Sequence, residues 1–277
     1  MGGWTLMLGA QEIRQLAEEL DIRPTKKLGQ NFVLDPNTIH RIVNQAQLSK
    51  DDLPVEIGPG LGSLTLGLFA QVPEVIAVEV DERLAQRLPK TIQKHAPQAL
   101  LHLVTADALR VKELPKNPTA LVANLPYNIS VPVLLHFLET FPTIKKGLVM
   151  VQAEVAHRLA AAPGSKDYGA PSLKLAFYGP ARLAGNVPRS IFWPVPGVDS
   201  ALVYFENNRE DISQRKAVFE AIDFGFAQRR KTLRQALAGY AGGAQAAEEL
   251  LVRAGVSPSA RAEELGIEQF LAIASAK

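Results

Sequence analysis

The chain has 277 residues, 47% of them hydrophobic and 21% charged, which is the balance of a globular protein and not of a disordered one. It contains no cysteine, so disulfides, thiolate metal sites and a cysteine nucleophile are excluded. A net charge of +2 is only mildly basic and does not by itself indicate nucleic-acid binding.

No apolar stretch reaches the roughly 18 residues needed to cross a bilayer, and the first residues lack the basic and apolar regions of a secretion signal. We therefore expect a cytoplasmic protein with no membrane partner. The five histidines show no i,i+4 pair and no convergence with carboxylates, so we expect no metal site.

The first predicted element is a helix over residues 10–20, followed by a polar and basic segment at 23–32 with one embedded aromatic residue. This segment contains Lys26 and Lys27. Composition leaves two interpretations open, a solvated linker or an additional contact to a nucleic-acid backbone.

Five short apolar runs then alternate with segments that are mostly long enough for a helix. Such alternation predicts a parallel sheet covered by helices on both faces, with ligands bound at the carboxyl ends of its strands. The predicted strands are Leu53–Ile57, Val75–Val80, Leu100–Thr105, Thr119–Ala123 and Gly147–Val151.

The first of these strands ends in a glycine-rich turn, Glu56-Ile57-Gly58-Pro59-Gly60-Leu61-Gly62, ahead of a helix expected to begin near Ser63. Glycine lets the backbone approach a ligand closely. The third glycine comes one residue too early for the dinucleotide fingerprint G-x-G-x-x-G, and Pro59 removes an amide donor that could face a pyrophosphate. The turn therefore favours a cofactor without phosphates.

Acidic residues stand at the ends of the next two strands. Glu79 can accept hydrogen bonds from both hydroxyls of a ribose, whereas Asp81 is expected to cap the helix beginning at Glu82. Asp107 is either a cap or an acceptor for the amino group of an adenine. A glycine turn, a glutamate and an aspartate at three successive strand ends make S-adenosylmethionine a better candidate cofactor than NAD.

The fourth strand runs into Asn124-Leu125-Pro126-Tyr127. The Asn124 amide oxygen and the Leu125 carbonyl, whose direction is limited by the following proline, can accept both hydrogens of one exocyclic amine. Tyr127 offers a flat face for stacking on the base. An aromatic amine is a poor nucleophile until such hydrogen bonds pull its nitrogen towards a tetrahedral shape. The tetrapeptide therefore predicts alkylation of a base, although an ordinary strand-ending turn uses the same residue types.

Residues 163–196 are rich in proline and glycine, and the apolar stretches Leu173–Tyr178 and Ala201–Phe205 are predicted to be the last two strands, antiparallel at the sheet edge. Helical periodicity then predicts helices over Ala217–Ala238, Ala244–Ala254 and Ile267–Ala274. We expect an α/β domain at residues 1–207 and a small all-α domain at 208–277.

Basic residues cluster within the first of these helices, with no acid between Phe226 and Arg234. On a continuous helix they lie beside the apolar face. Composition alone favours a solvated basic surface, but next to a base-modifying site the cluster would supply the phosphate contacts that set register. The basic residues are Arg229, Arg230, Lys231 and Arg234.

Five motifs in this order resemble the rRNA adenine N6,N6-dimethyltransferases, with a match from about residue 26 to about residue 237. They are Lys27-Leu28-Gly29-Gln30-Asn31-Phe32, Glu56-Ile57-Gly58-Pro59-Gly60, Asn124-Leu125-Pro126-Tyr127-Asn128-Ile129-Ser130, Phe192-x-Pro194-x-Pro196-x-Val198-Asp199-Ser200-Ala201 and Arg229-Arg230-Lys231-Thr232-Leu233-Arg234. The last two motifs favour the type that acts on the small ribosomal subunit over the macrolide-resistance type that acts on the large one.

The resemblance implies a Rossmann-like, S-adenosylmethionine-dependent methyltransferase fold with a helical C-terminal domain. It implies that two adjacent adenosines near the 3′ end of 16S rRNA become N6,N6-dimethyladenosines, with the small ribosomal subunit as partner; a monomer fits this role. By position, the expected cofactor contacts are Asn31, Val33, Gly58, Gly60, Glu79, Asp107 and Asn124. The target base is expected at Asn124, Leu125, Pro126 and Tyr127, with Phe192 as a second stacking partner.

The sequence departs from the family pattern at two places, Val33 where leucine is usual and Ala170-Pro171 where other residues are commoner. The first change is conservative, and the second puts in doubt only the shape of a loop. Other functions stay open: methylation of adenine in DNA or in large-subunit rRNA, and non-catalytic binding of pre-ribosomal RNA. An NAD oxidoreductase is disfavoured by the glycine spacing.

Overall fold

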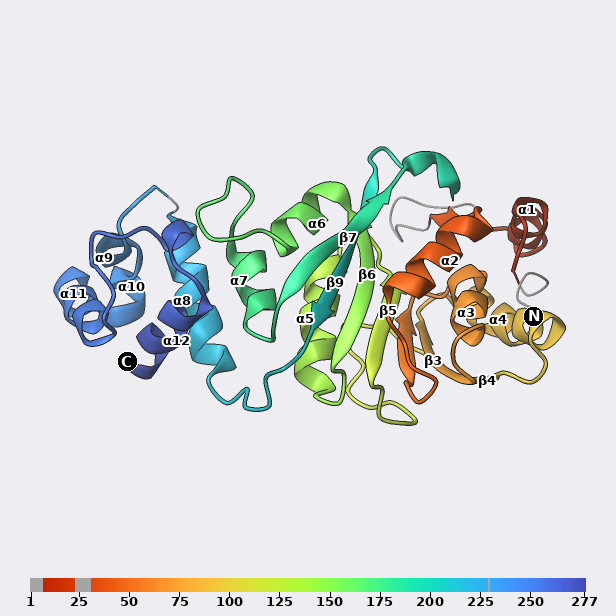
Figure 1. Ribbon diagram of the computed structural model, residues 1–277, viewed down its shortest axis with the longest axis horizontal. Helices are drawn as coiled ribbons and strands as arrows, with labels where there is room; N and C mark the ends of the chain where they lie inside the picture. Colours follow the sequence, from red (N-terminus) through yellow and green to blue (C-terminus); the bar gives the residue numbers. More distant parts are fainter. Residues whose placement is uncertain (1–6, 23–30, 229) are drawn as a thin grey trace. The chain divides into compact units, whose positions relative to one another are not determined.

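The computed structural model describes residues 7–22, 31–228 and 230–277, and the chain divides into two compact units (Figure 1). One unit consists of Met1–Ala156 and Leu183–Glu206, the other of His157–Arg182 and Asn207–Lys277. Among the predicted RNA contacts, Lys26, Lys27 and Arg229 lie outside the described residues.

A mixed sheet forms the centre of the first unit. Its strands are β2 (Pro54–Ile57), β3 (Glu74–Glu79), β4 (Leu100–Thr105), β5 (Ala120–Asn124), β6 (Lys146–Gln152), β7 (Ala181–Val187) and β9 (Ser200–Glu206). Their order is β4-β3-β2-β5-β6-β9-β7, with the first five parallel to one another and β9 antiparallel to β6. The predicted parallel sheet is confirmed, as is the antiparallel strand at 201–205.

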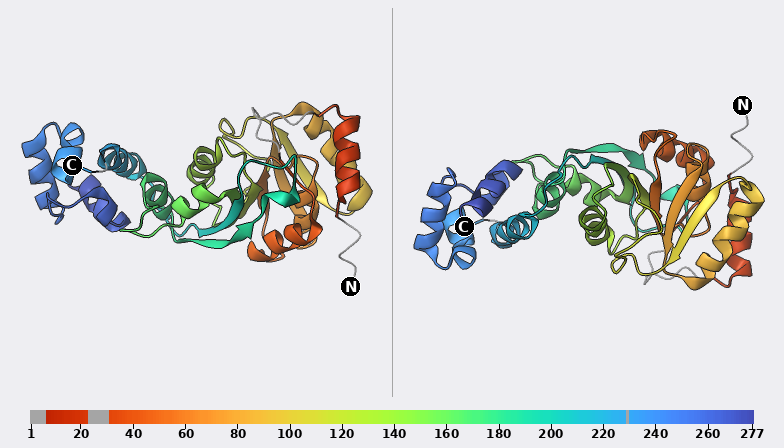
Figure 2. Two further views of the ribbon diagram at one scale, coloured as in Figure 1. Left: turned by 90° about the horizontal axis from the view of Figure 1, so that it is seen from above. Right: turned by 90° about the horizontal axis from the view of Figure 1, so that it is seen from below.

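Helices lie on both sides of this sheet, and Figure 2 shows α2 and α5 on opposite sides. Two apolar clusters cover the same face of the sheet. Val75 belongs to one cluster and Ala77 to the other, and side chains two residues apart on a strand such as β3 are on the same face of the sheet. The first, the α2 cluster, contains Ile39 and Ile42; the second, the α4 cluster, contains Leu84 and Leu88. The helices are α1 (Ala10–Glu19), α2 (Pro36–Gln45), α3 (Ser63–Phe69), α4 (Glu82–His95), α5 (Ser130–Thr140) and α6 (Ala153–Leu159).

A second, two-stranded sheet was not predicted from the sequence. It pairs β1 (Phe32–Val33) antiparallel with β8 (Phe192–Trp193), which follows a short 3-10 turn at Arg189–Ile191. Side chains alternate across such a ribbon. Val33 and Phe192 therefore belong to the α2 cluster, whereas Phe32 and Trp193 pack with the α4 cluster.

The prediction of a strand over Leu173–Tyr178 is wrong. This stretch lies mostly in helix α7 (Ala170–Ala176). Pro171 is tolerated in the first turn of a helix, and Ser172 Oγ accepts a hydrogen bond from Gly169 N at 3.0 Å. The apolar side chains at 173, 175, 177 and 178 are all buried, so this apolar stretch reflects burial in a helical unit and not a strand. The edge strand is β7 instead, whose residues are mostly exposed.

The second unit is helical, as predicted for the end of the chain. Its helices after α7 are α8 (Arg215–Ala227), α9 (Leu233–Ala236), α10 (Ala238–Ala241), α11 (Ala244–Arg253) and α12 (Ile267–Ser275), with a 3-10 turn at Ala262–Glu264. The prediction of one helix over Ala217–Ala238 is wrong, because α8 ends at Ala227. After the break, Leu233 N donates to Ala260 O at 2.8 Å and Arg234 N donates to Pro258 O at 3.2 Å. These long-range hydrogen bonds set where α9 begins.

Residues 157–182 belong to this helical unit, although the expected domain began at residue 208. The rings of Phe177 and Tyr178 contact Phe219 of α8 at centroid distances of 5.5 and 6.4 Å, and Arg215 Nε donates to the Tyr178 hydroxyl at 2.7 Å.

None of the described helices is long and apolar enough to cross a membrane.

Candidate active site

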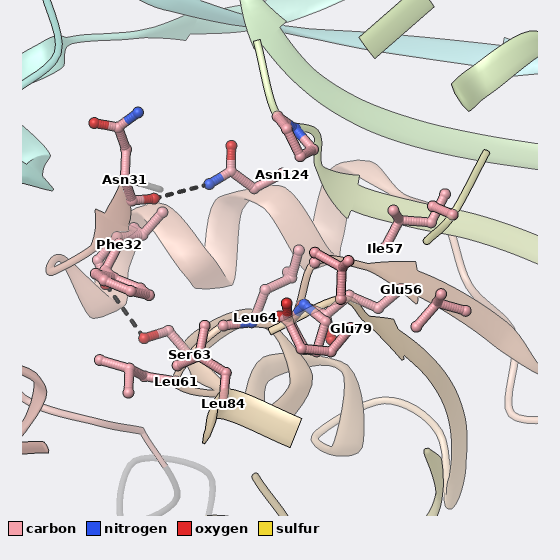
Figure 3. Close-up of a pocket in the computed structure, with 18 of the residues that line it drawn as sticks. Asn31, Phe32, Glu56, Ile57, Leu61, Ser63, Leu64, Glu79, Leu84 and Asn124 are labelled. Atoms are coloured by element: carbon pink, nitrogen blue, oxygen red, sulfur yellow. Dashed lines mark hydrogen bonds between the residues drawn. The ribbon is translucent and has the colours of Figure 1, made fainter. Parts of the chain in front are cut away.

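A cavity opens at the carboxyl ends of the parallel strands, where the strand alternation predicted a ligand site (Figure 3). It encloses about 900 Å³ of empty space, a volume that includes the solvent at its open mouth. All of the predicted cofactor contacts line it: Asn31, Val33, Gly58, Gly60, Glu79, Asp107 and Asn124.

The glycine turn forms the floor of the cavity and requires glycine for steric reasons. Gly58, Gly60 and Gly62 have φ of +68°, +57° and +100°, a region that other residues rarely adopt. A Cβ atom on Gly60 would lie 2.9 Å from Cε1 of Phe32, so the Phe32 ring lies directly against the turn.

Glu79 closes the end of β3 and is held by the backbone. Its Oε2 accepts from Gly60 N at 3.1 Å and its Oε1 accepts from Asp81 N at 2.9 Å. Burial raises the pKa of Glu79, and these N–H donors only partly oppose that rise. The predicted capping role of Asp81 is confirmed, because its Oδ1 accepts from Arg83 N at 3.0 Å.

Glu56 is a functional candidate that the sequence analysis did not single out, although it lies in the glycine motif. Its side chain lines the cavity, yet the residue is only 1% exposed, and Oε2 accepts from the Thr65 hydroxyl at 2.6 Å. Burial raises the pKa of Glu56 to about 8 against the opposing effect of Thr65, and the nearby Glu79 raises it further. The carboxyl is therefore protonated at neutral pH.

The charge of the cavity wall is one-sided. Glu79 and Asp107 bring carboxyl groups beside the protonated Glu56, and no lysine, arginine or histidine is among the lining residues that the structure describes. Such a wall attracts a cationic ligand and disfavours a pyrophosphate, for which arginine, lysine or free N–H donors are the usual partners. Asp107 also accepts from Leu109 N at 3.0 Å, so it caps a turn and lines the cavity at once.

Asn124 stands at the end of β5 with its amide orientation set by a hydrogen bond. Its Nδ2 donates to Asn31 O at 3.1 Å, which leaves the amide oxygen in the role of acceptor. The next residue is anchored because Leu125 N donates to Met150 O at 3.0 Å. The Leu125 carbonyl is thus flanked by Asn124 and Pro126, both of which line the cavity.

The two predicted stacking residues are not placed alike. Tyr127 is half-buried, and its hydroxyl shares a 2.7 Å hydrogen bond with Ser200 Oγ of β9, but the side chain does not line the cavity. Burial raises the pKa of Tyr127. Phe192 is 1% exposed within the α2 cluster, so the structure does not bring it to the cavity. Phe192 pairs with Val33 and shares its side of the two-stranded sheet, whereas Trp193 is on the side of Phe32.

The predicted RNA contacts that the structure describes lie in the second unit. Arg230 and Lys231 are exposed in the segment between α8 and α9. Arg234 is half-exposed, and its Nε pairs with Glu248 Oε2 at 2.8 Å. All three residues are therefore exposed, and Arg234 also pairs with α11.

Residues 23–277 match the family described as ribosomal RNA adenine dimethylase. The chain is 57% identical over 273 residues to ribosomal RNA small subunit methyltransferase A of Thermobifida fusca, covering 97% of this chain and 95% of the relative. It is 55% identical over 275 residues to the protein of the same name from an Arthrobacter strain, covering 98% and 93%.

Among solved structures, the chain resembles a dimethyladenosine transferase from Plasmodium falciparum, with a TM-score of 0.76. The superposition covers 87% of this chain and 95% of the other at 23% sequence identity. This likeness confirms the predicted Rossmann-like methyltransferase fold.

Proposed function

The chain belongs to the ribosomal RNA adenine dimethylase family, and on this premise we propose that it uses S-adenosylmethionine to dimethylate the N6 amines of two adjacent adenosines near the 3′ end of 16S rRNA. The small ribosomal subunit is then its partner. We further propose that it acts in the cytoplasm as a monomer, with residues 208–277 contributing RNA contacts.

The observation that carries the choice of cofactor is the acidic cavity at the strand ends. S-adenosylmethionine supplies a methyl group on a positively charged sulfur and bears an ammonium group, so its positive charges complement the carboxyl groups of Glu79 and Asp107. Glycine is required at position 60 because a side chain there would meet Phe32. Without side chains at positions 58 and 60, the backbone of the turn is open to close approach by a ligand. The residues present therefore fit this cofactor.

The chain's own contribution to the reaction is placement of the amine. The Asn124 oxygen and the Leu125 carbonyl each accept one N6 hydrogen, which directs the nitrogen lone pair away from the ring plane. Positioning of this kind can account for a large part of a rate enhancement. No strong base is required, because the N6 proton becomes acidic once the nitrogen is alkylated and then leaves to solvent or to Asn124. Tyr127 and Phe192 remain predicted stacking partners, and Phe192 would have to leave its buried position to serve as one.

The test is mass spectrometry of small-subunit rRNA before and after incubation with this protein and S-adenosylmethionine. We expect two adjacent adenosines to gain two methyl groups each. Cofactor binding without methylation of any substrate would favour a non-catalytic assembly factor. Methyl incorporation into DNA or large-subunit rRNA, but not into small subunits, would reassign the substrate.

A further inference from the structure

The segment from Ile191 to Ser200 contacts both halves of the proposed active site. At its start, Leu34 N donates to Ile191 O at 2.8 Å, and β8 pairs with β1, which borders the cavity. At its end, Ser200 Oγ holds the hydroxyl of Tyr127 at 2.7 Å. One continuous stretch of chain thus joins the wall of the cofactor cavity to the tetrapeptide that is proposed to hold the base.

Trp193 contacts the cavity wall through Phe32. Its ring stacks on Phe32 with a centroid distance of 6.3 Å and an interplanar angle of 23°. Phe32 lines the cavity and also lies against the glycine turn. A shift of the Phe32 ring would therefore change the space between β1 and the turn, where the cofactor is proposed to bind.

The residue that precedes β1 orients the side-chain amide of Asn124. Asn31 directly precedes Phe32, and its carbonyl accepts the hydrogen bond that orients Asn124. A displacement of β1 would lengthen that hydrogen bond as well as widen the cavity. The contacts run from Trp193 through Phe32 and Asn31 to Asn124.

We propose that Trp193 is a positioning residue, whose ring keeps β1 against the glycine turn and so sets both cofactor affinity and the orientation of Asn124. Trp193 occupies an unspecified position of the motif Phe192-x-Pro194, so the family resemblance assigns it no role. This inference rests on the proposed function and deepens it.

The experiment compares two apolar replacements that differ in whether they keep a ring. Dissociation constants for S-adenosylmethionine and S-adenosylhomocysteine are measured by calorimetry, well below the thermal midpoint of each variant. We expect Trp193→Leu to weaken binding about three- to tenfold, the size of an aromatic pair contribution, and Trp193→Phe to stay within about twofold of wild type. The matched control is Val195→Ala, which alters a 61% exposed side chain in the same segment and should bind as wild type does.

A second measurement follows turnover at saturating cofactor. Trp193→Leu should lower kcat as well as affinity, because Asn124 loses its support, and Trp193→Phe should restore both. A purely structural role would lower the thermal midpoint while leaving the dissociation constants and kcat unchanged. Should Trp193→Leu fail to fold, Trp193→Met tests the same point with a flexible ringless side chain.

The outcomes separate this proposal from the function on which it rests. Wild-type protein that binds neither S-adenosylmethionine nor S-adenosylhomocysteine contradicts the proposed function itself. Tight wild-type binding with unchanged affinity in Trp193→Leu overturns only the role of Trp193. Equal weakening by the leucine and phenylalanine variants also overturns it, since the ring would then not be what matters.

Discussion

Both polar atoms of the Asn124 side chain have a role. The nitrogen donates a hydrogen bond to Asn31 O, and the oxygen is the proposed acceptor for the substrate amine. Replacement by alanine removes that oxygen and leaves the carboxyl groups and the glycine turn in place. We expect Asn124→Ala to bind S-adenosylmethionine with near wild-type affinity and to lose roughly 100-fold or more in turnover, as misplacement of a reacting group does. Calorimetry and a methyl-transfer assay on small subunits measure the two quantities separately.

The matched control for Asn124→Ala is Asn117→Ala, which removes the same chemical group from an exposed position. It should leave affinity and turnover unchanged. Near-normal turnover in Asn124→Ala would show that the amine is held by other groups.

Glu56 links the cavity to pH-dependent stability. Burial raises the pKa of Glu56 from its ordinary value of 4.5 to about 8 in the folded protein, so between these values the folded state binds a proton that the unfolded state lacks. The free energy of unfolding therefore falls as pH rises through this window, by at most about 1.4 kcal/mol per pH unit from this group, and levels off above the folded pKa.

Glu56→Gln keeps the shape of the side chain but cannot ionise. We expect the variant to lose this part of the pH dependence, so that wild type and variant diverge between pH 6 and pH 8, with the wild type becoming relatively less stable. Urea unfolding at several pH values gives the free energy of unfolding of both proteins. The contributions of the other titrating groups cancel in the difference between wild type and variant. Parallel curves would mean that Glu56 titrates normally.

At the scale of elements, the segment between α8 and α9 decides how the basic residues are presented. A continuous helix would have placed them along one arc, whereas the break after Ala227 leaves Arg230 and Lys231 on an exposed connection. We expect the double variant Arg230→Ala, Lys231→Ala to bind small-subunit RNA more weakly and to show a shallower dependence of log K on log salt, by about one unit per lost phosphate contact.

A charge-matched control for the basic segment is the double variant Lys50→Ala, Lys90→Ala, which removes two exposed lysines of the first unit. It should keep the wild-type salt slope. Filter binding across a salt series measures both pairs, and an unchanged slope in the Arg230 and Lys231 pair would assign these residues a structural role.

For the whole molecule, the membership of residues 157–182 in the helical unit has a consequence for truncation. Phe219 of α8 is covered by Phe177 and Tyr178, which a fragment of residues 208–277 lacks. We expect this fragment to expose apolar surface, to bind a hydrophobic dye and to unfold without a cooperative transition. Thermal denaturation followed by near-ultraviolet circular dichroism tests this, with the full chain as reference. Cooperative unfolding of the fragment would contradict it.

The division of functions between the units stays a prediction. The described residues that line the cavity all belong to the first unit, and the exposed basic pair belongs to the second. RNA binding by the second unit is what the salt-slope experiment examines.

The sequence by itself determined the parallel sheet, the glycine turn and the polar residues that stand at the strand ends around the cavity, but it did not single out Glu56. Buried parallel strands appear as continuous apolar runs, and their carboxyl ends meet at one edge of the sheet whatever the exact packing. Glu79, Asp107 and Asn124 were therefore predictable as neighbours although they are far apart in the chain, because each directly follows a strand or ends it.

Only the tertiary structure decided which apolar residues face which neighbour. The apolar run Leu173–Tyr178 fits a buried helix as well as a buried strand. No proline or glycine follows Ala227 at the break, and the start of α9 is set by hydrogen bonds that its first residues donate to the carbonyls of residues 258 and 260. The same limit separates Phe192 from Trp193, since pairing register alone determines which ring enters the core. Contacts of this kind depend on residues distant in sequence, and local patterns carry no information about them.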